Sequence, residues 1–269
     1  MLTLGSKEFY RKWIRDILDC QDPESGHIQH TAPFMGGGGG LAEYTTFPAR
    51  FVHKIPDTLS YEKAALVEPM SVGYHSLEVG GFRSGHVAVV AGAGPIGLAT
   101  IECLKALGAE KIIVVQRKSV RQEYALRAGA DILLEPGKDD VVAEIYRLTG
   151  GAGADIAFET TGSEQCLLLL LESIKAAGTL VVTSIWEGPA TLHPNLLVMK
   201  ERQMVGSICY CGDFPKVIEL LDSGRIPAEG YVTKKICLED VVKEGFASLT
   251  GPEKKSQVKI LVTPDCNLL

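Results

Sequence analysis

The sequence predicts an α/β protein in which helices cover both faces of a parallel β-sheet. Short, continuously apolar segments occupy residues 87–91, 111–115 and 132–134, and each is followed by a segment with helical periodicity. Apolar strands that alternate with helices in this way are typical of a parallel sheet buried on both faces. A glycine-rich turn joins the first strand to its helix. This arrangement predicts a doubly wound Rossmann domain.

Composition restricts the class of protein and of partner. Of the 269 residues, 46% are hydrophobic and 22% charged, as in ordinary globular proteins, and the net charge of −6 argues against a nucleic-acid surface. No apolar run is long enough to cross a membrane, and the N-terminus lacks the apolar core of a secretory signal. We therefore expect a cytoplasmic protein with a small-molecule substrate and with neither a membrane nor a nucleic acid as partner.

The seven cysteines are scattered and include no CxxC pair, which favours reduced thiols. Cys209 and Cys211 could be read as a metal site, but we interpret them as core packing.

The first third of the chain is less regular. Residues 1–35 are polar, with one short amphipathic helix expected over 9–14, and five consecutive glycines at 36–40 predict a flexible connection. Alternating patterns predict strands over 42–47 and 51–56. Ser60 is a capping residue that predicts a helix start, and residues 65–79 are expected to be helical with an interruption near Glu68 and Pro69.

The remaining elements follow from the same patterns. Helices are expected over 95–107, 121–128, 140–148, 164–176 and 214–223, and further strands over 156–159, 179–184 and 204–209.

The glycine-rich turn carries the strongest functional signal. In the stretch GAGPIG, Gly92 allows a tight turn, Gly94 lets the backbone approach a diphosphate, and Gly97 lets helix and strand pack closely. Pro95 suits the start of a helix, where its missing N–H costs nothing. The turn follows a strand and opens a helix, which is the context that a dinucleotide-binding motif requires. The alternative is a glycine-rich turn without a ligand.

The residues after the second strand predict which dinucleotide is bound. An acidic residue normally accepts hydrogen bonds from the adenosine ribose at this place, but the chain has Gln116, followed by Arg117, Lys118, Ser119 and Arg121. A carboxylate would repel a 2′-phosphate, whereas an amide beside guanidinium groups would accept it. We therefore expect NADP, with NAD less favoured. The alternative is a solvated charge cluster at the start of a helix.

Several segments resemble the zinc-dependent medium-chain dehydrogenase/reductase superfamily, in particular its butanediol and sorbitol dehydrogenase branch. They are GGGLAEYTTFPARFVHKIPDTLSYEKAALVEPMSVGYHSL at 38–77, VAVVAGAGPIGLATIECLKALGA at 87–109, DIAFETTG at 155–162, VTSIWEGPA at 182–190, ERQMVGSICY at 201–210 and VTKKICLEDVVKEGF at 232–246. The resemblance covers residues 36–263, most of the chain.

This resemblance implies a Rossmann domain over 69–227 and a truncated GroES-like second domain formed by 36–68 and 228–269, after an atypical segment at 1–35. It also implies a homodimer that associates through residues 191–199 and 205–207. The implied cofactor contacts are Gly94, Pro95 and Ile96 at the diphosphate, Arg117 and Arg121 at the adenosine end, and Thr161, Gly162, Ser184, Ile185, Trp186, Ser207, Ile208 and Cys209 around the nicotinamide.

The chain departs from the family at the metal. The GxCGSDxH and GHE segments that supply zinc ligands do not occur, nor does the four-cysteine loop of the structural zinc. Only Glu68 matches a position near the metal, and one carboxylate cannot hold zinc, so zinc is expected to be absent. A replacement site at His27, His30 and Glu24 is disfavoured, since Pro23 and Gly26 break the helix that it would need.

Three interpretations of function follow. The first is an alcohol dehydrogenase-like oxidoreductase that transfers hydride between NADP(H) and a small alcohol, carbonyl or enone without zinc, with Tyr44, Tyr74, His75 and Tyr210 as candidate proton donors. The second is a cofactor-binding pseudoenzyme, or a non-redox enzyme that retains the Rossmann domain. The third is a truncated gene model, which the change of character before Gly36 would fit. We favour the first.

Overall fold

The computed structural model describes Leu41 and residues 52–268. Its strands are β1 (Val87–Ala91), β2 (Lys111–Val115), β3 (Ile132–Leu134), β4 (Ala154–Glu159), β5 (Ile174–Val182), β6 (Gln203–Gly206), β7 (Val232–Cys237) and β8 (Lys259–Thr263). Its α-helices are α2 (Tyr61–Ala64), α3 (Val67–Val79), α4 (Pro95–Ala106), α5 (Arg121–Ala128), α6 (Val141–Leu148), α7 (Glu164–Ser173), α8 (Asn195–Val198), α9 (Phe214–Asp222) and α10 (Ala247–Thr250). Short turns of other helical types are η3 (Leu238–Asp240), η4 (Val241–Phe246), η5 (Pro252–Lys255) and η6 (Cys266–Leu268).

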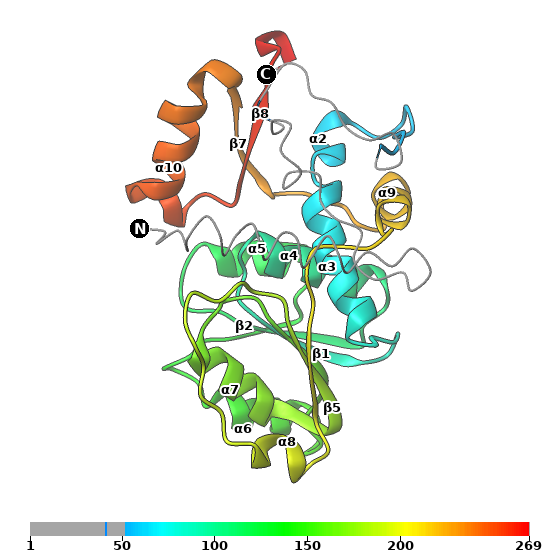
Figure 1. Ribbon diagram of the computed structural model, residues 1–269, viewed down its shortest axis with the longest axis vertical. Helices are drawn as coiled ribbons and strands as arrows, with labels where there is room; N and C mark the ends of the chain where they lie inside the picture. The colour runs from blue at the N-terminus through cyan, green and yellow to red at the C-terminus, as the bar shows by residue number, and fades with distance from the viewer. Residues whose placement is uncertain (1–40, 42–51, 269) are drawn as a thin grey trace, which may run out of the picture.

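Six strands form one parallel sheet in the order β3-β2-β1-β4-β5-β6 (Figure 1). The chain starts in the middle at β1, runs outward to β3, and then crosses back to β4. The strand order therefore reverses between β1 and β4, and ligands of such sheets bind outside the carboxyl ends of the strands at this reversal. The predicted doubly wound α/β fold is confirmed.

The register brings four strand ends level at this point. Ala91 pairs with Glu159, Glu159 with Val182, and Val182 with Gly206. The segments that follow these residues consequently leave the sheet along one edge.

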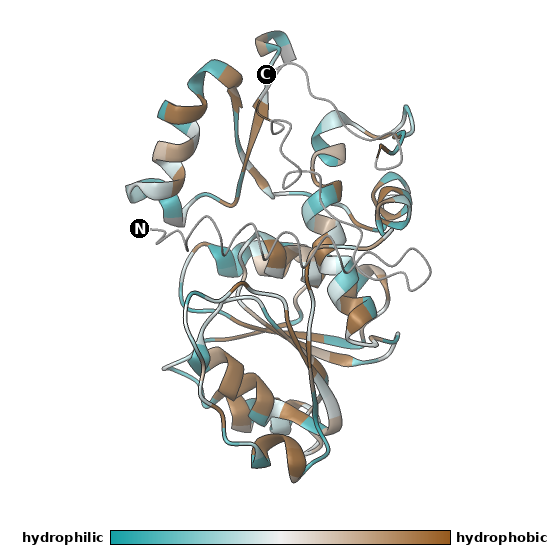
Figure 2. Ribbon diagram, viewed as in Figure 1, coloured by the Kyte–Doolittle hydropathy of each residue, from teal (hydrophilic) through white to brown (hydrophobic). Residues whose placement is uncertain are grey.

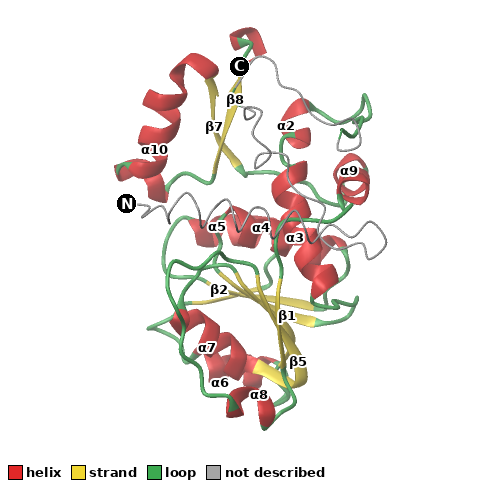
Figure 3. Ribbon diagram, viewed as in Figure 1, coloured by secondary structure: helices red, strands yellow, loops and turns green. Residues whose placement is uncertain are grey.

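Helices cover both faces of the sheet (Figure 3), and each face has its own core. Within β1, Ala88 and Val90 pack on the side of α3, α4 and α9, whereas Val89 and Ala91 pack on the side of α6 and α7. Both faces of β1 are therefore covered by a buried core. Figure 2 shows the mainly hydrophobic character of α7 and of the strands beside it. This double burial explains why the strands are continuously apolar.

The sequence predicted several elements to the residue: β1, β2, β3 and α5. Ser60 is the N-cap of α2, where its hydroxyl accepts a hydrogen bond from the backbone N–H of Lys63, as the capping pattern predicted.

Several predictions of secondary structure were wrong, among them the strands at 179–184 and 204–209, which run over Ile174–Val182 and Gln203–Gly206 instead. The expected strand at 51–56 is absent over 52–56. Pro56 begins a turn in which its carbonyl oxygen accepts a hydrogen bond from the backbone N–H of Leu59. Pro69 does not interrupt α3, because it lies in the first turn, where backbone N–H groups have no intrahelical acceptor. The helix expected to reach residue 176 ends at Ser173, since Ile174 already pairs with Ala154 in the sheet.

Beyond the six-stranded sheet, β7 and β8 form a separate parallel pair (Figure 1). The predicted domain boundaries, and the GroES-like origin of this part, stay predictions. The predicted helix at 9–14 and strand at 42–47 lie outside the described residues. None of the helices that the structure describes has the length and apolar character needed to cross a membrane.

The expectation of reduced thiols was wrong for one pair: Cys237 and Cys266 are joined in a disulfide. The two residues are separated by 29 positions and meet only because β7 and β8 lie side by side, which no local spacing pattern reveals.

Candidate functional site

The glycine turn after β1 leaves the backbone open beside the start of α4. Gly92 has a φ of 97°, which side-chain-bearing residues rarely adopt. A Cβ on Gly97 would lie 2.1 Å from the carbonyl oxygen of Gly92, so only glycine lets α4 begin this close to β1. Gly94 is the N-cap of α4 and Pro95 its first residue. The first N–H groups of α4 lack intrahelical acceptors and can bind a diphosphate.

Gln116 ties the end of β2 to this turn. Its Oε1 accepts a hydrogen bond from the backbone N–H of Ala93 at 2.8 Å. Its Nε2 donates to the carbonyl of Arg117 at 3.0 Å and to the hydroxyl of Ser119 at 3.3 Å. The side chain is thus engaged within the protein, and its evident role is to hold the turn after β2 against the glycine turn.

One guanidinium group lies beside the glycine turn. Nη1 of Arg121 lies 3.7 Å from the position that a Cβ on Gly94 would occupy. Arg117 is exposed on the preceding turn. Neither forms a salt bridge with another residue in the described part of the chain. A cation without a protein counter-ion beside the free N–H groups at the start of a helix favours binding of an anion. We call Gly92–Gly97, Gln116, Arg117 and Arg121 the glycine half of the site.

The opposite half is organised around Glu159, the last residue of β4, whose side chain is fully buried. Its Oε1 accepts hydrogen bonds from the backbone N–H groups of Thr161 at 2.6 Å and Gly162 at 3.0 Å, and from the hydroxyl of Thr161. Its Oε2 accepts from the hydroxyl of Ser184, which follows β5. One carboxylate therefore fixes two loops that leave neighbouring strands.

A second hydroxyl joins this loop to the glycine half. Oγ1 of Thr160 donates to the carbonyl of Ala91 at 2.7 Å, and the same oxygen would lie 2.9 Å from a Cβ on Gly92. The glycine turn and the loop after β4 therefore pack directly against one another.

A cleft of about 500 Å³ opens where these loops meet. It is lined by Val72, Ile96, Thr160, Thr161, Thr183, Ser184, Ile185, Ser207, Ile208 and Cys209. We call its residues from the loops after β4, β5 and β6 the hydroxyl half of the site.

Two of its buried hydroxyls, on Thr183 and Ser207, have no hydrogen-bond partner among the described residues. Buried polar groups normally have partners, so these two indicate a polar ligand or water in the cleft. Together with the open glycine turn, they fit a nicotinamide dinucleotide.

The helix α3 packs its polar face against the segment that follows β6. Glu68 lies beside Tyr210, whose hydroxyl donates to it. Burial raises the pKa of Glu68, and the effect is partly offset by Lys259 and by the Tyr210 hydroxyl. Burial, with the nearby Glu68 charge, raises the pKa of Tyr210, which keeps the phenol protonated.

A second pair lies further along α3. Nδ1 of His75 is 3.0 Å from Oδ2 of Asp213, and both side chains are mostly buried. The backbone N–H of Cys211 donates to the same oxygen at 2.7 Å. The carboxylate therefore orients the imidazole, which leaves Nε2 as the nitrogen for other chemistry. Val72, three residues before His75 on the same helical face, lines the cleft.

The other candidate proton donors are less well placed. Burial raises the pKa of Tyr74 to about 12, with smaller contributions from the negative charge of Glu78 and from its hydrogen bond with the Tyr74 hydroxyl. Tyr74 does not line the cleft. Tyr44 lies outside the described residues, as do His27 and His30.

Among the described residues, Glu68 does not belong to a group of potential zinc ligands. A catalytic zinc needs about three protein ligands. Within residues 52–268, His, Cys, Asp and Glu side chains converge in groups of three or more only at Cys237, Glu239 and Cys266, and that group does not include Glu68.

The structure brings together in one cleft most of the residues predicted at the nicotinamide end, namely Thr161, Ser184, Ile185, Ser207, Ile208 and Cys209. Ile96, predicted at the diphosphate, lines the same cleft. Sequence reasoning missed Glu159, Thr160, Thr183 and Val72. A signal for Glu159 was present, since an acidic residue follows the apolar run 156–158 at the end of β4.

Known proteins resemble this chain in sequence and in structure. The family model for zinc-binding dehydrogenases matches residues 95–223. The chain is 47% identical over 231 residues to the (R,R)-butanediol dehydrogenase of Bacillus subtilis, and the aligned segment covers 86% of this chain and 66% of the relative. It is 41% identical over 256 residues to the (R,R)-butanediol dehydrogenase of Neisseria gonorrhoeae, and this aligned segment covers 94% of this chain and 72% of the relative. The chain thus spans about two thirds of the length of these relatives.

Two solved structures extend the comparison. The 2R,3R-butanediol dehydrogenase of Bacillus subtilis matches with a TM-score of 0.81 at 46% identity, over 86% of this chain and 66% of that one. A chain described as a zinc-binding dehydrogenase from Sinorhizobium meliloti, solved with NADP bound, matches with a TM-score of 0.77 at 25% identity, over 84% of this chain and 66% of that one. The protein belongs to the zinc-type medium-chain dehydrogenase/reductase superfamily.

Proposed function

We propose that this protein is an oxidoreductase that transfers hydride between NADP(H) and a small alcohol, carbonyl or enone, without a catalytic zinc. The observation that carries the proposal is the two-part site. The glycine turn with the Arg121 guanidinium beside it forms one part. The cleft forms the other, where the buried hydroxyls of Thr183 and Ser207 have no hydrogen-bond partner among the described residues.

The preference for NADP(H) rests on the glycine half. Arg121 lies beside Gly94, and Arg117 is exposed on the turn before it. A 2′-phosphate placed there would form charge-assisted hydrogen bonds with one or both guanidinium groups. The related Sinorhizobium meliloti chain with bound NADP supports this choice.

The proposed substrate class rests on the two sequence relatives described above, which are both butanediol dehydrogenases. A bound nicotinamide would supply or accept the hydride. The hydroxyls of Thr183 and Ser207 would hold its polar group, while Val72 and Ile185 would exclude water from one side.

A proton must also reach the substrate oxygen, and we assign that role to His75. Asp213 holds Nδ1, so Nε2 would donate to the developing oxyanion or take its proton in the reverse direction. Tyr210 fits this role less well than His75, because its raised pKa and its hydrogen bond to Glu68 keep the proton on the phenol.

The direct test measures NADPH oxidation with a panel of diketones, hydroxyketones and enones, on protein whose zinc content has been determined. We expect turnover by zinc-free protein and a loss of about 100-fold in kcat for His75→Gln. An unchanged kcat in His75→Gln would overturn the assignment of the proton donor. Turnover only in proportion to bound zinc would overturn the zinc-free mechanism.

One observation favours a second function, a protein that binds the cofactor without redox chemistry. His75 and Tyr74 do not themselves line the cleft. Tight NADPH binding with no turnover across the whole panel would support this alternative.

We also propose a homodimer that forms through β6. This strand lies at the edge of the sheet, and Val198, Met199 and Met204 near it are 68%, 76% and 40% exposed. A dimer would cover this edge and these side chains. Light scattering should show twice the mass of one chain, and Met204→Lys should shift it toward the monomer. A monomeric wild-type protein would contradict the proposal.

A further inference from the structure

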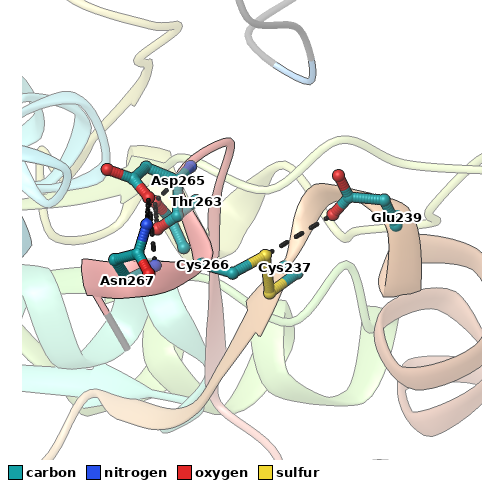
Figure 4. The surroundings of a disulfide bond; sticks show 6 residues. All are labelled: Cys237, Glu239, Thr263, Asp265, Cys266 and Asn267. Carbon is teal, nitrogen blue, oxygen red and sulfur yellow. Dashed lines mark hydrogen bonds between the residues drawn. A yellow bond between two sulfur atoms is a disulfide. The ribbon is translucent and has the colours of Figure 1, made fainter.

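Three potential metal ligands converge at the far end of the β7–β8 pair, outside the residues that line the cleft. Cys237 ends β7, Glu239 belongs to η3, and Cys266 begins η6 (Figure 4). One ligand atom from each lies within 4.8 Å of the others. We call these residues the thiol–carboxylate cluster.

The carboxylate is directed at the sulfur atoms. Oε2 of Glu239 lies 3.6 Å from Sγ of Cys266, and the sulfur of Cys237 is bonded to that of Cys266. A structural disulfide does not require a carboxylate beside it. After reduction, the negative charge of the Glu239 carboxylate would disfavour ionisation of the thiols, because a thiolate and a carboxylate repel one another. A divalent cation reverses this effect and stabilises all three anionic groups together.

The spacing of the cluster fits zinc. In a tetrahedral site with Zn–S bonds of about 2.3 Å and Zn–O bonds of about 2.1 Å, ligand atoms lie roughly 3.5–3.8 Å apart. The present separations of up to 4.8 Å reach these values with small side-chain rotations once the disulfide is open. Glu239 and Cys266 are exposed, so an ion can reach them and water can supply a fourth ligand.

We propose that the thiol–carboxylate cluster is a redox-controlled zinc site, which is a disulfide when oxidised and binds one Zn²⁺ when reduced. A dithiol reductant transfers two electrons and two protons, so that the S–S bond becomes two thiols and the dithiol becomes a cyclic disulfide. Binding of Zn²⁺ then forms two Zn–S bonds and one Zn–O bond and releases the two thiol protons. The Cα atoms of the cysteines are 5.4 Å apart, and either state ties η6 to the end of β7.

The test uses the full chain, reduced with a phosphine, desalted without oxygen and titrated with Zn²⁺ against a chromogenic chelator. Co²⁺ serves as a spectroscopic probe, since thiolate ligands give it a charge-transfer band and tetrahedral geometry gives it intense visible bands. We expect reduced wild-type protein to bind one more equivalent than Cys237→Ser. The oxidised protein should bind no more than that variant.

Glu239→Gln keeps both thiols and alters an exposed side chain, so it tests the third ligand in a folded protein. We expect it to weaken Zn²⁺ binding by at least about tenfold. Glu253→Gln, on exposed η5, and Cys166→Ser, on α7, are matched controls that should bind as wild type does. Equal binding by reduced wild type and Cys237→Ser would overturn the site, and unchanged affinity in Glu239→Gln would overturn the three-ligand assignment.

Discussion

The glycine half of the site is shaped by the backbone, whereas the hydroxyl half is shaped by side chains that meet at one carboxylate. In the glycine half, Gly92 and Gly97 let strand and helix approach more closely than any side chain permits. In the hydroxyl half, Glu159 holds Thr161 and Ser184 from two different loops. The first half depends on neighbours in sequence and can be recognised as a motif. The second depends on residues that only the sheet brings together.

We expect the greatest loss at Gly97, where the neighbouring backbone leaves no space for a side chain. In Gly97→Ala the new Cβ would lie 2.1 Å from the Gly92 oxygen, so the turn must move. We expect a loss of at least about 3 kcal/mol in the free energy of unfolding, together with loss of dinucleotide binding. Urea denaturation measures the first and a fluorescence titration the second.

Gly188→Ala is the matched control, because a Cβ there meets nothing within 4 Å. It should stay within about 0.5 kcal/mol of wild type. Equal losses in the two variants would show that the close approach at Gly97 is not the cause.

In the hydroxyl half we expect a smaller effect from Glu159→Ala. The change leaves the backbone N–H groups of Thr161 and Gly162 without their acceptor. The expected loss in the free energy of unfolding is about 2 kcal/mol, and the affinity for the cofactor should fall as the two loops separate. Glu164→Ala, an exposed change a few residues later on α7, should alter neither quantity. Intact stability and affinity in Glu159→Ala would contradict the central position of this carboxylate.

Glu102, in the helix that begins at the glycine half, contrasts with Glu159. It is only 1% exposed, and its one hydrogen bond within the described residues comes from the N–H of Ala228. Burial, with the nearby charge of Glu229, raises its pKa to about 8, against the opposing effects of that bond and of Lys63.

This raised pKa predicts how stability depends on pH. Between about pH 4.5 and 8 the folded protein holds a proton at Glu102 that the unfolded chain has released. Stability is therefore greatest at the acidic end of this range and falls as the pH rises. From about pH 6 to 8 the fall from this group should reach about 2 kcal/mol, and Glu102→Gln should remove it. Parallel pH profiles for the two proteins would refute the prediction.

The smallest expected effect concerns the choice of cofactor. Arg121→Ala should weaken NADPH binding by about tenfold, or about 1.4 kcal/mol, and leave NADH binding nearly unchanged. Arg83→Ala is the control, an exposed guanidinium in the turn that precedes β1. Equal weakening of both cofactors by Arg121→Ala would mean that Arg121 does not recognise the 2′-phosphate.

The sequence predicted β1, β2, β3 and α5 to the residue and α4 to within one residue, because the segments there are bounded by glycine and by helix-capping positions. It predicted the end of α7 wrongly, since pairing of Ile174 with Ala154 is a long-range event. The internal bonds of Gln116 were missed for a related reason. Its amide reaches back to Ala93, which lies 23 positions earlier in the chain.

The candidate site shows the same division. The glycine motif and the two arginines could be recognised as local patterns. Residues of the hydroxyl half were predicted only through the family resemblance, and Glu159 and Thr183 were not predicted. The disulfide between Cys237 and Cys266 was beyond prediction, because it depends on how β7 and β8 pair.

We propose above all that the site binds a nicotinamide dinucleotide with a preference for its 2′-phosphorylated form. Equilibrium titration of the wild-type protein with NADPH and NADH, followed by nicotinamide fluorescence, is the direct test of this proposal. We expect saturable binding of both cofactors, with NADPH bound at least about tenfold more tightly. Equal affinity, or tighter binding of NADH, would contradict it.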